Sequence, residues 1–155
     1  MRILGIDPGL NNVGWGIIDK NGSKIVFVAS GAIKTSSKES LDKRLLHISE
    51  NIKQVIEAYT PQTVAIEETY VNVNPKSSLV LGIARGAIIL TVASLNVPCS
   101  YYEPMLIKKT ITGSGKADKE QIQKMVRLLL PTADFATHDA ADALAIAFCH
   151  SSFCR

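Results

Sequence analysis

Apolar residues at the start of the chain form three short runs that predict β-strands over residues 2–7, 13–19 and 25–33. Pro8-Gly9 follows the first run. Asn21-Gly22 separates the second run from the third, and Asn-Gly favours the positive φ angles of a tight hairpin. Because connections this short join antiparallel strands, we expect the three strands to be antiparallel neighbours.

Beyond residue 40 the apolar residues recur at intervals of three and four, which predicts helices separated by short strands. Proline and cap residues set several of the expected ends. In order, the pattern predicts a helix over about 41–59, a strand over 63–67, a helix over about 78–95 capped by Ser77 or Ser78, a strand over 97–102, a short helix over 104–111, a helix between the cap residue Asp118 and Pro131, and a helix from the cap residue Thr137 to about Cys149.

This order of elements predicts an α/β fold with a five-stranded mixed sheet, the three antiparallel strands coming first, flanked by helices. The chain has 155 residues, of which 46% are hydrophobic. That length and composition are typical of one globular domain with a proper core, so we expect residues 1–155 to form a single domain.

The expected helix over residues 78–95 is apolar on nearly every side. It is therefore either a deep core helix or one that combines a core face with an interface. Gly82 and Gly86 share one face, where another backbone could approach closely. Arg85 and several polar residues interrupt the apolar run, which argues against a membrane span.

Four carboxylates occupy positions that the predicted elements can bring together. Asp7 and Glu67 end apolar runs, and their nearest neighbours on the same strand face are small. Asp139 and Asp142 lie three residues apart near the start of the last helix, on one face. Taken singly, Asp7 could be a turn residue and Asp142 a solvated helix residue. Together, four carboxylates repel one another unless cations neutralise them, and oxygen-only ligands favour hard ions such as Mg²⁺.

Net charge and cysteine content limit which binding partners and which cell compartment are compatible with the chain. The formal charge of +3 permits a polyanionic partner without requiring one. Three sparse cysteines suit a reducing cytosol. Cys149-His150 and Cys154 could be part of a metal site, but their spacing fits no closed zinc pattern.

Four motifs, in order along almost the whole chain, resemble those of the RuvC-type Holliday-junction resolvases. The resemblance implies a ribonuclease H-like fold and a homodimer, for which the helix over about 78–95 is the candidate interface. It also implies Mg²⁺- or Mn²⁺-dependent cutting of four-way DNA junctions by two symmetric nicks, in the cytoplasm and alongside a branch-migration complex. The motifs are Gly5-Ile6-Asp7-Pro8-Gly9, Ala65-Ile66-Glu67-Glu68, Leu81-Gly82-Ile83-Ala84-Arg85-Gly86 and His138-Asp139-Ala140-Ala141-Asp142-Ala143-Leu144-Ala145.

The resemblance also assigns roles to individual residues. His138 is interpreted as a neighbour of the site and not as a ligand. Tyr70 falls where relatives often carry an aromatic residue near the junction centre, and stacking on a base suits it; it could instead anchor its loop. The metal ligands are Asp7, Glu67, Asp139 and Asp142, with two Mg²⁺ ions; Lys108 and Lys119 match basic positions near the active site; and Lys109, Lys116, Lys76 and Arg85 are either further DNA contacts or solvated charges.

Other functions fit the residues less well. Gly113-Ser114-Gly115-Lys116 lacks the spacing and the final hydroxyl residue of a phosphate-binding P-loop. Actin-like ATPases share the Gly-Ile-Asp-Pro-Gly pattern but need a second domain. A related nuclease for ribosomal RNA precursors has different motifs around the glutamate. A junction-binding protein without catalysis would gain nothing from carboxylates that face phosphates.

Overall fold

A mixed β-sheet forms the centre of the computed structural model, which describes residues 1–68 and 74–154. Within these residues the sheet has five strands in the order β3-β2-β1-β4-β5. Strands β1, β2 and β3 pair antiparallel, whereas β1 with β4 and β4 with β5 pair parallel. The strand bounds are β1 Arg2–Asp7, β2 Asn12–Asn21, β3 Lys24–Lys34, β4 Thr63–Glu67 and β5 Cys99–Tyr102.

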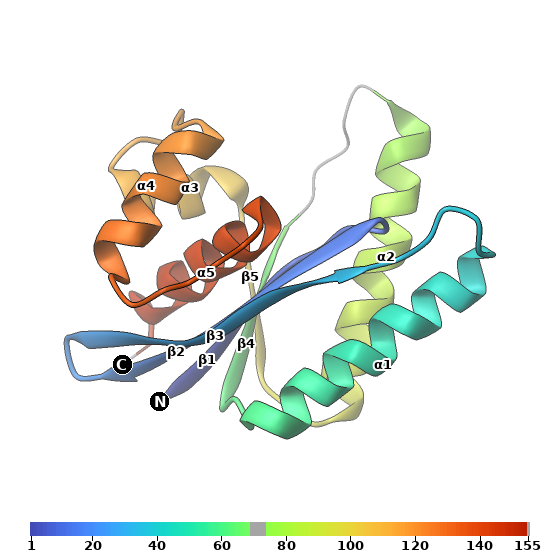
Figure 1. Ribbon diagram of the computed structural model, residues 1–155, viewed down its shortest axis with the longest axis horizontal. Coiled ribbons are helices and arrows are strands. Elements are labelled where there is room, and N and C mark those ends of the chain that lie inside the picture. The colour runs from blue at the N-terminus through green and yellow to red at the C-terminus, as the bar shows by residue number, and fades with distance from the viewer. Residues whose placement is uncertain (69–73, 155) are drawn as a thin grey trace.

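Helices cover both faces of the sheet and enclose one hydrophobic core on each side (Figure 1). One face carries α1 and α2, and the other carries α3, α4 and α5. Side chains that alternate along β1 divide between the two cores: Ile3 belongs to the core under α5, and Leu4 and Ile6 belong to the core under α1 and α2. The helix bounds are α1 Leu41–Tyr59, α2 Pro75–Ser94, α3 Pro104–Thr112, α4 Lys119–Leu129 and α5 His138–Ser151.

The predicted fold is confirmed, with corrections at two element starts. Asn74, and neither Ser77 nor Ser78, caps α2: its side chain accepts hydrogen bonds from the backbone N–H groups of Lys76 and Ser77, and Pro75 occupies the first turn. The fifth strand begins at Cys99, after Pro98, and not at residue 97. Proline has no N–H for the ladder, which explains the later start.

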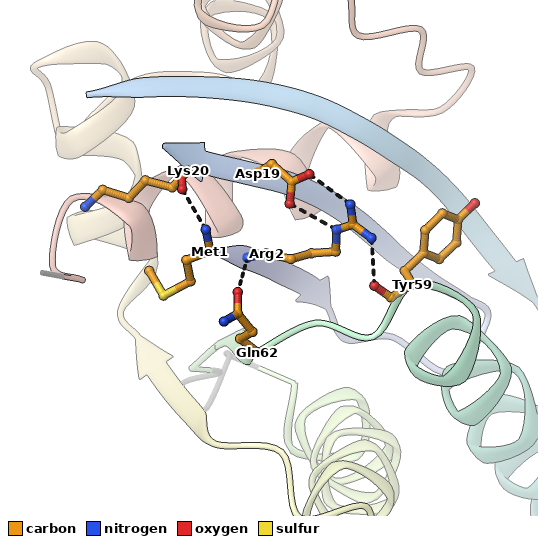
Figure 2. A network of polar contacts seen from close by, with 6 residues as sticks. All are labelled: Met1, Arg2, Asp19, Lys20, Tyr59 and Gln62. Carbon is orange, nitrogen blue, oxygen red and sulfur yellow. Dashed lines mark hydrogen bonds and ion pairs between the residues drawn. The ribbon is translucent and has the colours of Figure 1, made fainter. Parts of the chain in front are cut away.

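The start of β1 is held by polar contacts that fix its place in the sheet (Figure 2). Arg2 donates to both carboxylate oxygens of Asp19, at 3.0 and 2.9 Å, and to the backbone carbonyl of Tyr59 at 3.0 Å. The N-terminal ammonium group donates to the carbonyl of Lys20 at 2.7 Å. These contacts join β1, β2 and the end of α1 at the edge of the sheet opposite to Asp7.

Helix α2 has one buried face and one exposed apolar face. Ala84 and Ile88 are fully buried, whereas Leu79 and Leu90 keep 65% and 71% of their surface exposed. The helix is long and apolar enough to cross a membrane by length and composition alone, which is weak evidence for a span. The exposed face excludes the alternative of a deep core helix, and the interface stays a prediction.

Candidate active site

Asp7 and Glu67 lie at the same edge of the sheet because their strands are parallel neighbours. Strands β1 and β4 pair up to Ile6 opposite Ile66, and each carboxylate residue directly follows its last paired residue. Ala65 belongs to the core under α5, so Glu67, two residues further along, points to that same face. The carboxyl ends of two parallel strands thus supply two of the predicted carboxylates.

Helix α5 supplies the other two, and it lies unusually close to the sheet. A Cβ atom on Gly5 would be 2.1 Å from the carbonyl oxygen of Ala143, and one on Gly14 would be 2.0 Å from the carbonyl oxygen of Asp139. Only glycine leaves room for the helix backbone at these two positions. This close contact brings Asp142 alongside the ends of β1 and β4.

One pocket of about 260 Å³ gathers three of the four carboxylates and two lysines. Asp7 and Glu67 line it from the sheet, and Asp142 lines it from α5. Lys108 of α3 and Lys119 of α4 complete its polar lining. Apolar residues form the rest of the wall: Pro104, Ile107, Ile122, Ala145 and Ile146.

The pocket shifts the pKa of its carboxyl groups upward. Burial, and then repulsion from Glu67, Asp142 and Asp139, raises the pKa of Asp7 to about 8. Burial, and then the charge of Asp142, raises the pKa of Glu67, while Lys108, a hydrogen bond from Asp7 and Lys119 oppose the rise. Buried carboxyl groups that repel one another in this way are neutralised either by bound protons or by cations.

Burial also raises the pKa of Asp142, against the opposing charge of Lys119. Asp139 adds to the rise, while His138 and Lys108 oppose it. Asp142 therefore belongs to the same electrostatic group as the two carboxylates of the sheet.

The donor set fits a hard divalent ion. It offers carboxylate oxygens, which Mg²⁺ and Mn²⁺ prefer, and a cation there would offset the repulsion that contributes to the raised pKa of Asp7 and Glu67. Across residues 1–68 and 74–154, no three Asp, Glu, His or Cys side chains lie close enough together to hold a metal ion among them. Mg²⁺ is usually held by one or two carboxylates plus water and substrate phosphates, so an open ligand set is compatible with it.

Asp139 faces a neighbouring pocket, and this pocket shares Lys119 with the first one. Gln123, His138 and Glu120 also line it. His138 begins α5 and hydrogen-bonds the Gln123 side chain. Its interpretation as a neighbour of the site and not a ligand stays a prediction. Asp139 still contributes to the high pKa of Asp7, so it belongs to the same electrostatic group.

The family model for the crossover junction endodeoxyribonuclease RuvC matches residues 3–150. The chain belongs to the RuvC family. It is 46% identical to the crossover junction endodeoxyribonuclease RuvC of Xanthobacter autotrophicus, over 97% of this chain and 89% of that protein. It is 47% identical to that of Beijerinckia indica, over 100% and 89%.

Solved structures of the RuvC family share the fold. T. thermophilus RuvC in complex with a Holliday junction substrate superposes with a TM-score of 0.91, at 32% identity, over 99% of this chain and 94% of that chain. The yeast mitochondrial Holliday junction resolvase, at 14% identity, 96% and 78% coverage and a TM-score of 0.66, shares the fold alone. The ribonuclease H-like resolvase fold expected from the sequence is therefore confirmed.

The other predicted DNA contacts of this RuvC-family chain are dispersed. Lys116 lines a separate pocket between α3 and α4, and Lys76 lines one beside Leu10. Lys109 is exposed on α3. Arg85 is half-buried and contacts Tyr101 and Glu67. Tyr70 lies outside the described residues.

Two glycines important for the site were missed by sequence reasoning. Gly14 and Gly16 alternate along β2 on the face that α5 contacts, and a Cβ atom on Gly16 would lie 2.7 Å from Cγ of Leu144. Glycine at alternate positions in a strand signals close approach by another backbone, and this signal was present in the sequence.

Proposed function

We propose that this chain is a Mg²⁺-dependent endonuclease that resolves four-way DNA junctions by paired, symmetric nicks during recombination and repair. The observation that carries the proposal is the single pocket in which carboxylates from β1, β4 and α5 meet lysines from α3 and α4. The names of the relatives and the junction bound by T. thermophilus RuvC support the choice of substrate. A binding protein without catalysis would have no use for buried carboxylates in this place.

Asp7, Glu67, Asp139 and Asp142 are the proposed ligands for two Mg²⁺ ions, for which Mn²⁺ can substitute. When bound, the ions would supply the charge that ionises a water molecule and stabilises the departing oxygen of the cut phosphodiester. Lys108 and Lys119 line the same pocket and are proposed to bind the phosphates on either side of the cut. Asp7 and Glu67 each directly follow the last pair between β1 and β4, so this pairing sets the two carboxylates side by side at the ends of the strands.

Helix α2 is the proposed interface of a homodimer. Leu79, Gly82, Gly86 and Leu90 share its exposed face, opposite to the buried side chains of Ala84 and Ile88. Among the described residues, and apart from the adjoining part of α2 itself, no atom lies within 4 Å of a Cβ atom built on either glycine, so a second helix can approach there. A two-fold dimer presents two identical sites, as two nicks in strands of like polarity require.

The remaining parts of the proposal concern surroundings and partners. Residues 1–155 act as one nuclease domain. The proposed substrate and the three free cysteines, Cys99, Cys149 and Cys154, fit a cytoplasmic location. A branch-migration complex is the proposed protein partner. Tyr70 is proposed to stack near the junction centre, and Lys109, Lys116 and Lys76 are proposed as outer phosphate contacts.

A cleavage assay with synthetic substrates tests the proposed function. The chain is incubated with a four-way junction and with a linear duplex of the same sequence, in a concentration series of Mg²⁺, Mn²⁺ and Ca²⁺. The proposal predicts paired nicks in the junction with Mg²⁺ or Mn²⁺ and an intact duplex. Tight binding without any nicks would favour the junction-binding protein instead.

A further inference from the structure

Arg85 joins the end of strand β4 to strand β5 from helix α2. Its Cζ atom lies over the ring of Tyr101, 5.1 Å from the centroid. Its Nε donates a hydrogen bond to the backbone carbonyl of Glu67 at 3.2 Å. The guanidinium group is therefore engaged twice, once by a ring of β5 and once by the residue that carries a site carboxylate.

The side chain and the backbone of Glu67 have contacts on opposite faces of the sheet. Its carboxylate lines the active-site pocket on the α5 face of the sheet. Arg85 belongs to α2, whose buried residue Ile88 packs into the core on the opposite face. Arg85 thus holds the backbone of Glu67 from behind, while the carboxylate faces the proposed metal ions.

The position of Glu67 makes such support useful. The pairing of β1 with β4 ends at Ile66, so Glu67 is the last residue of its strand and lies beyond this pairing. On the other side, the N–H of Glu68 donates to the carbonyl of Tyr102 at 2.8 Å. Glu67 also pairs with Tyr102 of β5, so the ladder holds this last residue of β4 on one side only. A terminal residue paired on one side is held less firmly than an interior one, and movement of Glu67 would misplace its carboxylate.

We propose that Arg85 is a positioning residue for Glu67: it clamps the end of β4 against β5 and so holds the Glu67 carboxylate toward Asp7 and Asp142. This inference rests on the proposed function, because it takes Glu67 as a metal ligand. It gives Arg85 a role different from the phosphate contact suggested by its charge alone. Arg85 directly follows the buried residue Ala84, so the packing of α2 fixes the backbone from which its side chain extends.

The experiment measures metal binding and DNA binding separately in purified full-length variants. Mn²⁺ affinity is measured by titration calorimetry without DNA, and the Mg²⁺ midpoint of nicking is measured with a saturating junction. Junction affinity and its salt dependence are measured in Ca²⁺. Loss of an outer contact to a metal ligand typically weakens metal affinity by about 10- to 100-fold.

For Arg85→Ala we expect Mn²⁺ affinity to fall and the Mg²⁺ midpoint to rise by about tenfold or more, with junction affinity within about twofold of wild type. Arg85→Lys keeps the charge but lacks the planar group that can lie over a ring and donate in its plane, so its metal affinity should also fall. Tyr101→Phe keeps the ring and should behave as wild type. Tyr101→Leu removes the ring while Arg85 stays, and it should show a smaller loss in the same direction.

Arg127→Ala is the matched control. Arg127 of α4 lies over the Phe135 ring, with Cζ 4.3 Å from the centroid, so it makes the same kind of contact without touching Glu67. Its loss should leave metal affinity unchanged. If Arg85→Ala does not fold, the Arg85→Lys and Tyr101→Leu variants decide the question.

Two outcomes would overturn the inference. Weaker junction binding and a flatter salt dependence, with unchanged metal affinity, would make Arg85 a phosphate contact. A lower melting temperature as the sole change would make it a scaffold residue. The Glu67→Gln variant separates failure of this inference from failure of the proposed function. If Glu67→Gln nicks at the wild-type rate, the assignment of Glu67 to the metal site is wrong. If Glu67→Gln is inactive while Arg85→Ala behaves as wild type, only the positioning role of Arg85 is contradicted.

Discussion

Gly5 of β1 lies directly against the backbone carbonyl of Ala143 in α5, at a distance that leaves no space for a side chain. A Cβ atom on Gly5 would be 2.1 Å from that oxygen and 2.6 Å from the backbone nitrogen of Ala147. The contact brings a helix carboxylate to the ends of two parallel strands. Close backbone packing thus creates the site, two residues away from Asp7.

Gly5→Ala should push α5 away from the sheet and displace Asp142. We expect a loss of about 3 kcal/mol or more in the free energy of unfolding, since the clash is with backbone atoms on both sides. Nicking should be lost even where the variant folds. Urea unfolding and junction cleavage measure the two effects. Gly22→Asn is the control, because Gly22 has a φ of 60°, which asparagine tolerates, and a Cβ atom there would meet no described residue within 4 Å other than its chain neighbours.

Asp7→Asn should make the metal-free chain more stable at high pH. The pKa of Asp7 is raised to about 8 when folded, against about 3.9 in an unfolded chain. The folded state therefore keeps a proton that the unfolded state releases, so the unfolding free energy of the wild type falls as pH rises from about 4 to 8.

Asn removes this titration and the repulsion, and we expect a gain of about 2 kcal/mol at pH 8 in EDTA. Excess Mg²⁺ should reverse the order, because it binds the wild type more tightly. Thermal unfolding from pH 5 to 9 with and without Mg²⁺ measures both effects, with the exposed Asp134→Asn as control. A variant that is less stable than wild type at pH 8 without metal would contradict the electrostatic account of the pocket.

Lys119→Ala should weaken junction binding and reduce its dependence on salt. Lys119 lines both pockets at the carboxylate edge, and each lost phosphate contact lowers the slope of log K against log salt by about 1. Binding measured from 50 to 300 mM salt tests this. Lys53→Ala is the control: Lys53 pairs with Glu57 on α1, 3.7 Å away, on the other face of the sheet. Equal slopes for Lys119→Ala and wild type would identify Lys119 as a surface charge.

Leu90→Glu should convert a dimer into a monomer. Leu90 is 71% exposed in the apolar face of α2, and a carboxylate there would be desolvated against the same residue or its neighbours in the second copy. Leu128→Glu is the matched control, because Leu128 on α4 is also 71% exposed. Sedimentation velocity distinguishes the two states. A monomeric wild type at micromolar concentration would count against the interface.

Much of the fold could be predicted from the sequence because the evidence was local. Strand and helix periods and the caps at Asp118 and Thr137 each lie within a few residues, and the structure confirms them. The hairpin is confirmed too, but its loop residues are Gly22 and Ser23, because Asn21 ends β2 and pairs with Lys24. The carboxylates could be grouped because two of them end apolar runs.

Long-range relationships could not be predicted in the same way. The position of α5 against Gly14 depends on how a helix from the end of the chain packs onto a strand from its beginning. Arg85 looked like a free charge in an apolar helix, since nothing local shows that Tyr101 and the Glu67 carbonyl lie beside it. The start of α2 was misplaced because two serines and Asn74 all can cap a helix, and only the path of the chain selects one.

The most direct test of the carboxylate site compares binding and nicking of one synthetic four-way junction by wild type, Asp7→Asn, Glu67→Gln and Asp142→Asn. These substitutions keep size and remove charge. We expect all three variants to keep at least about one third of the wild-type affinity for the junction. In Mg²⁺ they should nick it at least about 10³-fold more slowly, which is a loss of about 4 kcal/mol in transition-state stabilisation. Nicking near the wild-type rate by any of the three would contradict the assignment of that carboxylate to the metal site.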